Sequence, residues 1–577
     1  MRTKNFLGIG LSVILLLPMT AVAQRKNAKP AKAVAETSAD AKAGLEAITA
    51  EQMRQILTFI AADELEGRNT PSQGLDIAAK FLAYNLSRWG FKPAGDGGTF
   101  FQRFNLRRGQ IDGGQTSLTL GALGAQTFKF GDDLLPRPLI GKAQGKLVYV
   151  GHGLVVKAKN VNAFAGLDVK DKLVIASEGA FPAGIQPIDL NGKLGVDYDT
   201  ALHYALTHGA RGVLLVPSPT VLKSWDRLKS AMSANSPASI DKLGEAPGAL
   251  PTAYVGEKTL NALFEGEKVS GSVVLQEAAN VKFTDSFALK GDKEATLNVA
   301  GNLEILPTQN VVAVWEGSDA TLKQEYVAIG AHYDHIGSHV ASDLGKTDNW
   351  SRYHLFLDAA GRFGSKDSLS NGADDDGSGT TGVLAIAEAL TKAPKPKRSI
   401  VLVWHAGEEW GLWGSEYFTD HPTVPLDKIV TQLNIDMIGR SRTPDDKNER
   451  DKGLTDPNSI YVIGSKKLSS ELGELSEAVN AGYLKLGFDY KYDDPNDSER
   501  LFYRSDHCNY ARKGVPIIFY FDGIHQDYHG VDDEVDRIDF DKMEKVARTV
   551  FATMWELANR AARVQVNKPQ AIPPSCH

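Results

Sequence analysis

Hydrophobic residues recur with helical spacing in two segments near the start of the chain. The first segment opens at Thr49, and Gln52 completes a capping-box pattern. Its apolar residues fall on one face of a helix: Met53, Ile56, Leu57 and Ile60. A second helix is predicted from about Gly74 to Trp89, where Gly90 ends it.

From about Gln309 onward, short apolar runs alternate with longer helical patterns. The predicted strands are Asn310 to Val314, Tyr326 to Gly330, Ser399 to Trp404, Val430 to Ile435, Ile460 to Ile463 and Val515 to Phe521. The predicted helices are Ser378 to Thr391, Ser469 to Leu486 and Asp541 to Arg560, the last with a capping box from Asp541 to Glu544. This alternation predicts an α/β fold, with a mostly parallel central sheet sandwiched by helices.

Between Asn105 and about residue 295 the pattern changes to short Val, Leu and Ile runs broken by Gly, Asp and Pro. Strands are predicted at Lys146 to Gly153, at Lys172 to Ile175 and at Val213 to Val216, with a helix from Asp199 to Thr207. The segment therefore predicts a β-rich domain inserted into the α/β domain.

Composition and charge narrow the class of protein. The chain has 577 residues, 42% of them hydrophobic, which is enough for more than one core. Its net charge of −7 gives no basic field to recruit nucleic acid. The only cysteines, Cys508 and Cys576, exclude a disulfide scaffold and a Cys-ligated zinc site, and they are either bridged to each other or free.

The first 23 residues have the pattern of a secretory signal. Arg2 and Lys4 precede an apolar run from Phe6 to Met19, and Ala21 to Ala23 form a small-residue cleavage site. The run is shorter than the roughly 20 residues that span a bilayer, so a membrane anchor is the weaker alternative. We expect a secreted or periplasmic protein without stable membrane insertion once the signal is removed.

Metal-ligand side chains follow the ends of the predicted strands. His332 and Asp334 come after the strand ending at Gly330, and Asp436 comes after Ile435. The other candidates are Glu408 and Glu409 after Trp404, Asp375 before the helix near Ser378, and His529 after Phe521. Ligands of such sheets bind outside the carboxyl ends of the strands, so these side chains are expected to meet there.

The residue types point to zinc, which accepts His nitrogen and carboxylate oxygen. Glu408 and Glu409 are adjacent acids at the end of an apolar strand, and burying both requires a cation between them. The simpler alternative is an exposed pair at the strand end. The acid run Asp374 to Asp376, flanked by glycines, has two alternatives of its own, a solvated acidic turn and a calcium loop. His335, His405 and His507 lie beside the motifs without matching a ligand position, and we expect them to support the ligands.

Five ordered motifs carry a family resemblance. They are A-H-Y-D-H at 331, G-A-D-D-D-G-S-G at 372, G-E-E-W-G at 407, N-I-D-M-I-G at 434, and S-D-H at 505 with Y-H-G-V-D-D-E at 528. In this order they resemble the co-catalytic zinc aminopeptidases, whose relatives include glutamate carboxypeptidase, glutaminyl cyclase and the transferrin receptor.

The resemblance implies two Zn²⁺ per chain. His332 and Asp436 hold one ion, Glu409 and His529 hold the other, and Asp375 bridges both. Glu408 is then the general base for a hydroxide held between the two ions.

The same resemblance implies supporting roles for three further residues. Asp334 orients the His332 ring, and Tyr528 stabilises the oxyanion. Asp506 belongs to the supporting shell, without an assigned role.

The implied function is that of an exopeptidase acting on peptide substrates, with removal of N-terminal residues as the first hypothesis. A carboxypeptidase or dipeptidase of the same fold stays open as the alternative. A glutaminyl cyclase and a non-catalytic, receptor-like relative are further alternatives. The sequence assigns no oligomeric state and no side-chain preference.

The inserted domain resembles the protease-associated domain, through V-Y-V-G-H-G at 148, G-L-D-V-K-D-K-L-V-I at 166 and A-L-T-H-G-A-R-G-V-L at 205. Residues 333–374 form a long insert rich in aromatic side chains, which we expect to be a loop over the substrate cleft.

These assignments divide the chain into six parts. The first two are the signal peptide at 1–23 and a flexible leader at 24–43. The peptidase domain comprises 44–136 and 296–563, with the protease-associated domain between them at 137–295. Residues 564–577 form a C-terminal tail.

Overall fold

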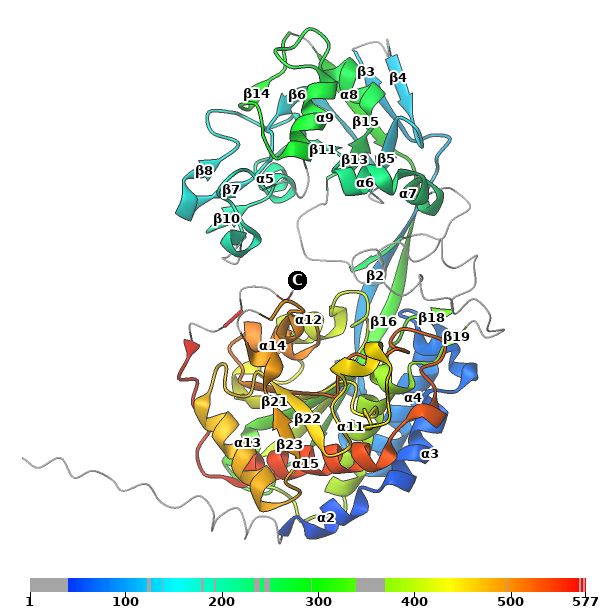
Figure 1. Ribbon diagram of the computed structural model, residues 1–577, viewed down its shortest axis with the longest axis vertical. Helices are drawn as coiled ribbons and strands as arrows, with labels where there is room; N and C mark the ends of the chain where they lie inside the picture. The colour runs from blue at the N-terminus through cyan, green and yellow to red at the C-terminus, as the bar shows by residue number, and fades with distance from the viewer. Residues whose placement is uncertain are drawn as a thin grey trace, which may run out of the picture.

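A computed structural model describes residues 40–121, 126–137, 140–177, 181–190, 194–232, 239–242, 250–291, 293–338, 369–494, 497–569, 572–573 and 576. They form two lobes joined by a pair of long strands (Figure 1). The predicted signal peptide and nearly all of the predicted leader lie outside these residues, as do positions 339–368 of the long insert. Within the described part of the chain, no helix is long and apolar enough to cross a membrane.

The larger lobe is built on one mixed sheet. Its order is β12-β2-β16-β20-β17-β21-β24-β22-β23, with β1 also paired to β16. The strands are β1 (Lys92–Pro93), β2 (Phe101–Ile111), β12 (Ser239–Lys242), β16 (Gly301–Trp315), β17 (Tyr326–His332), β20 (Ser399–His405), β21 (Ile429–Ile435), β22 (Ser459–Ile463), β23 (Gly487–Asp489) and β24 (Ile517–Phe521). The four central strands β20, β17, β21 and β24 are parallel, as predicted, whereas β2 and β16 on one side and β22 on the other join antiparallel.

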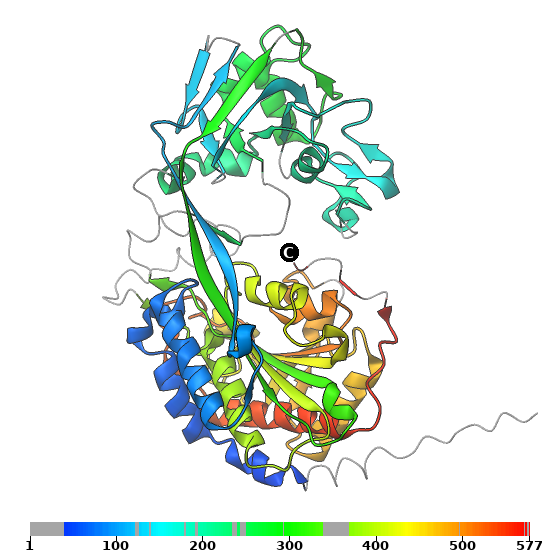
Figure 2. The ribbon, with the colours of Figure 1, turned by 180° about the vertical axis from the view of Figure 1, so that it is seen from behind.

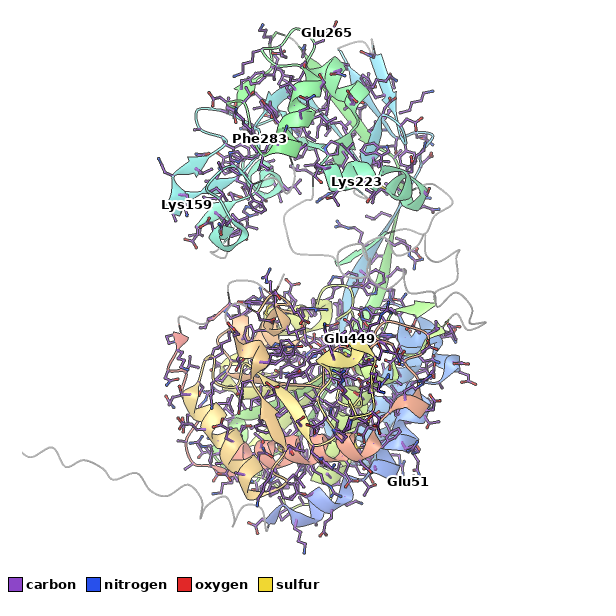
Figure 3. The ribbon with its side chains drawn as sticks, in the orientation of Figure 1. Glu51, Lys159, Lys223, Glu265, Phe283 and Glu449 are labelled. Atoms are coloured by element: carbon purple, nitrogen blue, oxygen red, sulfur yellow. A yellow bond between two sulfur atoms is a disulfide. The ribbon has the colours of Figure 1, made fainter. Side chains whose placement is uncertain are left out.

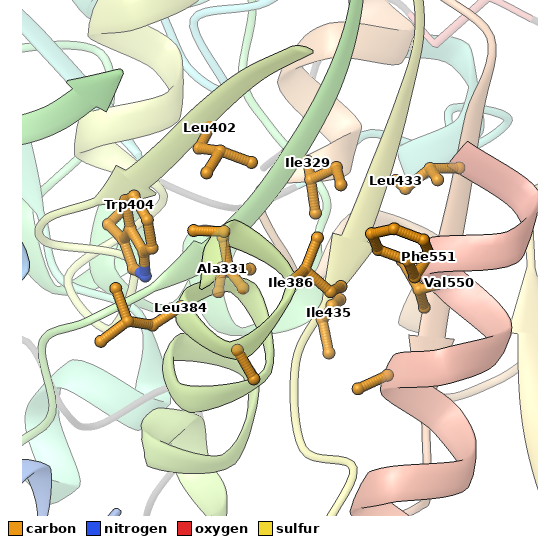
Figure 4. Close-up of a cluster of buried hydrophobic side chains, with 14 of the residues drawn as sticks. Ile329, Ala331, Leu384, Ile386, Leu402, Trp404, Leu433, Ile435, Val550 and Phe551 are labelled. Atoms are coloured by element: carbon orange, nitrogen blue, oxygen red, sulfur yellow. The ribbon is translucent and has the colours of Figure 1, made fainter. Parts of the chain in front are cut away.

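Helices cover both faces of this sheet. They are α2 (Lys42–Ala47), α3 (Ala50–Ile60), α4 (Gln73–Arg88), α11 (Gly379–Leu390), α12 (Trp413–Asp420), α13 (Ser470–Gly482), α14 (His507–Arg512) and α15 (Phe540–Asn559). One face packs against α11 and α15, where Ile329 and Leu433 contact residues such as Ile386 and Phe551 (Figure 4). The other face packs against α12 and α14 through Phe418 and Tyr510. Side chains of β17 and β20 alternate between the two faces of the sheet, and they are buried on both because helices cover both faces. The predicted α/β architecture is therefore confirmed.

The ends of the helices refine the sequence prediction. Thr49 caps α3 by accepting a hydrogen bond from the Gln52 backbone N–H, as expected. The capping box predicted for the last helix is wrong by two residues, because Asp539 and not Asp541 caps α15. The Asp539 carboxylate also accepts a hydrogen bond from Ser441, a contact between distant segments that the local pattern does not contain.

The second lobe contains its own nine-stranded sheet and a separate three-stranded sheet, as far as its described residues go. The larger sheet comprises β3 (Ser117–Leu120), β4 (Gln126–Lys129), β5 (Leu134–Pro136), β6 (Gly141–Tyr149), β9 (Leu173–Ser177), β11 (Gly212–Val216), β13 (Thr252–Val255), β14 (Phe287–Ala288) and β15 (Glu294–Val299). The small sheet comprises β7 (Val155–Val156), β8 (Val161–Asn162) and β10 (Tyr198–Asp199). The helices are α5 (Ala201–Thr207), α6 (Pro219–Lys223), α7 (Trp225–Met232), α8 (Glu257–Leu263) and α9 (Gly271–Asn280).

This lobe begins earlier in the chain than predicted. Strand β3 pairs with β15 and β4 pairs with β3, so the lobe starts at Ser117 and not at residue 137. The apolar core beneath this sheet includes Leu118 and Phe128, together with Leu297 from its last strand. Figure 3 shows Lys159, Lys223, Glu265 and Phe283 on this lobe, apart from Glu51 and Glu449 on the larger one.

Cys508 in α14 and Cys576 in the tail form a disulfide, with their Cα atoms 5.7 Å apart. Of the two possibilities left open by the sequence, the bridged one therefore holds. Both cysteines are buried beside Leu412. The bond ties the end of the chain to the helix that directly follows Asp506.

Candidate metal centre

The candidate ligands converge at the carboxyl edge of the central strands. His332 is the last residue of β17, and Asp436 directly follows β21. Glu408 and Glu409 follow β20, and His529 lies beyond the end of β24. Asp375 comes from the turn Ala373–Ser378 that leads into α11. The structure thus brings together all five predicted ligands and the predicted base.

A first group of donors gathers around His332, with ligand atoms of Glu408 and Asp436 within 4.8 Å of one another. The His332 Nε2 atom is 3.6 Å from Asp436 Oδ1 and 3.9 Å from Glu408 Oε2. His332 and Asp436 are buried, and the Glu408 side chain is 10% exposed. The His332 imidazole and the Asp436 carboxylate suit a zinc ion, and the Glu408 carboxylate lies beside them.

A second group contains His335, Asp375, Glu409 and His529, also within 4.8 Å of one another. The His529 Nε2 atom is 2.8 Å from Asp375 Oδ2 and 3.0 Å from Glu409 Oε2. The other oxygen of Glu409 is 2.6 Å from His335 Nδ1. This group provides a second place for a cation.

Asp375 connects the two groups. Its Oδ1 atom is 3.3 Å from His332 Nε2, whereas its Oδ2 atom is 2.8 Å from His529 Nε2. A carboxylate that presents one oxygen to each histidine has the geometry of a bridging ligand. The Asp374 to Asp376 run is buried, so its alternative as a solvated acidic turn does not hold.

The two adjacent glutamates differ in proton affinity. Burial, together with the Asp436 and Glu409 carboxylates, raises the pKa of Glu408 well above its usual range. Burial also acts to raise the pKa of Glu409, but the neighbouring His529 and His335 lower it to about 2. Glu409 is therefore the better anionic ligand, and Glu408 is the better proton acceptor.

Two residues hold the first group in place. The Asp334 backbone carbonyl and its carboxylate lie 3.1 and 3.6 Å from His332 Nδ1, consistent with the orienting role expected for Asp334. Asp334 also accepts a hydrogen bond from the Glu408 backbone N–H. The Ser505 hydroxyl donates to Asp436 Oδ2 at 2.6 Å and accepts from Asn434. Ser505 is the first residue of the S-D-H motif, but the resemblance assigns it no role.

Asp506 itself contacts a different histidine. Its carboxylate lies 3.3 Å from His405 Nδ1, and the Nε2 atom of His405 is 3.1 Å from the Tyr510 hydroxyl. These three buried groups lie beneath the site and join β20 to α14. Asp506 therefore acts on the site through the packing of these two elements.

Asp533 supports the bridging residue from behind. Its carboxylate accepts hydrogen bonds from the backbone N–H groups of Asp374 and Asp375, each at 3.1 Å. Asp533 is fully buried, with Arg440 Nη1 3.8 Å from its Oδ1. Asp533 belongs to the motif Y-H-G-V-D-D-E at 528, which by itself identifies no contact for it.

Tyr528 lies against the second group. Its ring stacks on the His529 ring, with centroids 3.7 Å apart. Burial and the nearby Asp375 raise the pKa of Tyr528 well above its usual range, so its hydroxyl stays a donor at neutral pH.

Comparison with known proteins identifies the larger lobe. The model of peptidase family M28 matches residues 310–554, which include every candidate ligand. Residues 310–554 form an M28 peptidase domain. The family recognised from the five motifs is thus confirmed, and the chain has a peptidase domain.

Individual relatives of the M28 domain are distant. The chain is 23% identical to "Aminopeptidase YwaD" of Bacillus subtilis over 397 residues, which cover 67% of this chain and 72% of that protein. It is 29% identical to a "Probable zinc metalloprotease" of Pyrenophora tritici-repentis over 233 residues, covering 34% of this chain but only 45% of the relative. Among solved structures, "Aminopeptidase from Aneurinibacillus sp. strain AM-1" aligns with a TM-score of 0.46 at 15% identity, over 91% of this chain and 98% of that one.

Proposed function

We propose that this chain is an exported zinc aminopeptidase that hydrolyses N-terminal residues from peptides. The observation that carries the proposal is the position of the Asp375 carboxylate, which presents one oxygen to His332 and the other to His529. The Glu408 carboxylate lies near His332 in the same site. The M28 domain and the relatives named as an aminopeptidase and a zinc metalloprotease support the same reading.

The donor set fits two zinc ions. His332 and Asp436 would hold one and Glu409 and His529 the other, with Asp375 shared. Four buried or nearly buried carboxylates within one small volume repel one another, and two divalent cations offset that repulsion. When bound, zinc lowers the pKa of water to about 7 and polarises the scissile carbonyl.

The chain's own residues then handle protons and charge. Glu408 accepts a proton from the attacking water and delivers it to the leaving amine, for which its raised pKa is suited. Tyr528, kept protonated, donates a hydrogen bond to the carbonyl oxygen, which becomes the oxyanion when water adds to the carbonyl carbon. Asp334 and Ser505 keep His332 and Asp436 in one orientation during the reaction.

Export is part of the proposal because residues 1–23 have the signal-peptide pattern. The Cys508–Cys576 disulfide supports it, since such bonds persist in oxidising compartments. Expression of the full chain, followed by N-terminal sequencing of exported protein, is expected to give a start near Gln24. Retention of the first residues in exported protein would contradict the predicted cleavage.

Peptides that differ only at one end test whether the enzyme cleaves at the N-terminus or at the C-terminus. Peptides with a free amine, the same peptides N-acetylated, and peptides amidated at the carboxyl end are compared with and without a chelator. We expect acetylation and the chelator each to abolish cleavage, and amidation to have little effect. Release of C-terminal residues from acetylated peptides would replace the proposal by a carboxypeptidase, and cyclisation of N-terminal Gln would indicate a glutaminyl cyclase.

Glu408 and Glu409 can be separated by paired substitution. Glu408→Gln is expected to lower kcat by about 10² to 10⁴ while zinc content stays at two per chain. Glu409→Gln is expected to lower zinc content itself, because it removes a ligand. Zinc per chain by elemental analysis and kcat measured on the same samples check both. Full activity of Glu408→Gln would refute its role as base.

A further inference from the structure

Among the residues that the structure describes, no strand pairs with one edge of β16 between Gly301 and Asn310. Within the described residues, Gly301 to Asn310 pair only with β2, whereas pairing with β20 begins at Val311. Figure 2 shows β2 and β16 running together between the lobes. A long strand with one open edge is a template on which an extended peptide can add as a further strand.

The open edge is on the side of the metal centre. β16 is antiparallel to β20, and β20 runs toward the centre and ends at His405, three residues before Glu408. Gly301 to Asn310 therefore extend past the end of β20. The edge of β16 that pairs with β20 from Val311 onward has no β20 residue opposite it in this stretch. Tyr333, which directly follows His332, donates a hydrogen bond to the Gln309 carbonyl at 2.5 Å on that side.

The register shows which backbone groups face outward. Ala300 accepts a hydrogen bond from Asp112, and Val312 donates one to Phe100, so even-numbered residues face β2 and its extension. The β16–β2 register has no bulge, and backbone direction alternates along a strand. Leu303 and Ile305 therefore turn their N–H and C=O groups to the open side, while Pro307 offers a carbonyl only.

The same two residues expose large apolar side chains. Leu303 is 51% exposed and Ile305 is 47% exposed, and both lie on one face of the strand. Natural sheet edges usually carry charged residues or proline, which prevent pairing with another chain. Among the residues on the same face as Leu303 and Ile305, only Pro307 is of this kind. A docked strand would place its own alternate side chains against this apolar pair.

We infer that the open edge of β16 binds the downstream part of the peptide substrate as an added antiparallel strand. The inference rests on the proposed aminopeptidase function. With its N-terminus at the metal centre, the peptide runs from the Gln309 end of the edge toward Gly301, opposite to β16. It favours apolar residues at alternate positions beyond the cleaved bond.

The first test is substrate length. Free-amine peptides of two to eight residues with one shared N-terminal residue are assayed on the full chain loaded with zinc. Two added backbone hydrogen bonds of ordinary strength raise kcat/KM by at least about fivefold from the shortest to the longest. N-methylation of alternate backbone nitrogens in one register removes this gain, and methylation in the other register leaves it.

The second test is a matched pair of variants. Leu303→Thr combined with Ile305→Thr keeps strand propensity but removes the apolar pair, and lowers the gain with length for apolar peptides. Glu304→Thr lies on the opposite face, where Glu304 is paired with Arg108, and keeps the wild-type gain. Zinc content and melting temperature, measured on each variant, distinguish loss of the edge from loss of the fold.

The outcomes separate the two proposals. Cleavage of short peptides with no gain for longer ones overturns the docking edge and leaves the aminopeptidase standing. No cleavage of any free-amine peptide by zinc-loaded protein overturns the aminopeptidase itself. A change of oligomeric state in the double variant, without a change in length dependence, would make the edge a self-association surface and also overturn the inference.

Discussion

At the scale of single residues, the site separates neighbours in the chain by what each side chain contacts. Glu409 lies between two histidines, and its pKa falls to about 2. Glu408 lies toward Asp436, and its pKa rises. Ser505 and Asp506 are also neighbours in the chain with different contacts. Ser505 contacts the ligand Asp436, whereas Asp506 contacts His405.

Ser505 provides a test of this division. Ser505→Ala removes the hydrogen bond to Asp436 Oδ2 and is expected to weaken zinc binding by about 10- to 100-fold. Competition with a fluorescent zinc chelator measures the affinity. Ser505→Thr keeps a hydroxyl and is expected to recover most of it. Equal affinity of Ser505→Ala and the wild type would show that the contact does not orient the ligand.

His507 predicts a dependence of stability on pH. Burial lowers its pKa to about 3, from about 6.5 in an unfolded chain. Between these values the unfolded state binds more protons, so the contribution of neutral His507 is complete above pH 6.5 and is lost as the pH falls toward 3. The full effect is about 5 kcal/mol, reached only at a pH below both values.

Denaturation of metal-free protein between pH 7 and 4 measures this effect. The free energy of unfolding is expected to fall less steeply in His507→Gln than in the wild type. His208 is exposed, so His208→Gln is the control and should keep the wild-type slope. An unchanged slope in His507→Gln would contradict the assignment.

At the scale of elements, short-range patterns predict where helices and strands lie, but contacts between them decide their ends. The helix at Ala50–Ile60 is capped by the residue that its local pattern indicates. The helix at Phe540–Asn559 is capped two residues earlier than its pattern indicates, where Asp539 also meets Ser441.

The cap of α15 can be tested directly. Asp539→Ala is expected to lower the free energy of unfolding by about 1–2 kcal/mol, because it removes the acceptor for the Lys542 N–H. Asp541→Ala, at the residue that the sequence pattern favours, is expected to change it by less than about 0.5 kcal/mol. Chemical denaturation of both variants measures the difference. The reverse order would restore the predicted capping box.

At the scale of the whole molecule, distant parts of the chain are joined through two connections. The paired strands β2 and β16 link the lobes, and the disulfide ties the tail to α14, across a sequence separation of 68. Because α14 follows Ser505 and Asp506, the second connection also fixes one wall of the metal centre.

Loss of the disulfide is expected to lower the free energy of unfolding by about 2–4 kcal/mol, since the open chain gains conformational entropy when unfolded. Cys576→Ser, compared with the wild type with and without reductant, measures it. Reductant should destabilise the wild type and leave the variant unchanged. Equal stability of the variant and the oxidised wild type would contradict the prediction.

The sequence by itself determined the central strands and the longest helices of the peptidase domain, though not β2, α12 or α14, and the order of the candidate ligands. Both follow from local rules, because apolar periodicity reports which faces are buried, and ligands follow strand ends. The sequence already indicated Asp334, His335 and Asp506 as supporting residues. Only the tertiary structure decided which groups they contact, and it added Ser505 and Asp533. The contacts of Ser505 with Asp436, of Asp533 with the Asp375 loop and of His335 with Glu409 join segments far apart in the chain, or depend on which way a side chain turns. Such contacts carry no periodic signal, and neither does the open edge of β16, because an unpaired strand edge depends on where the neighbouring strand ends.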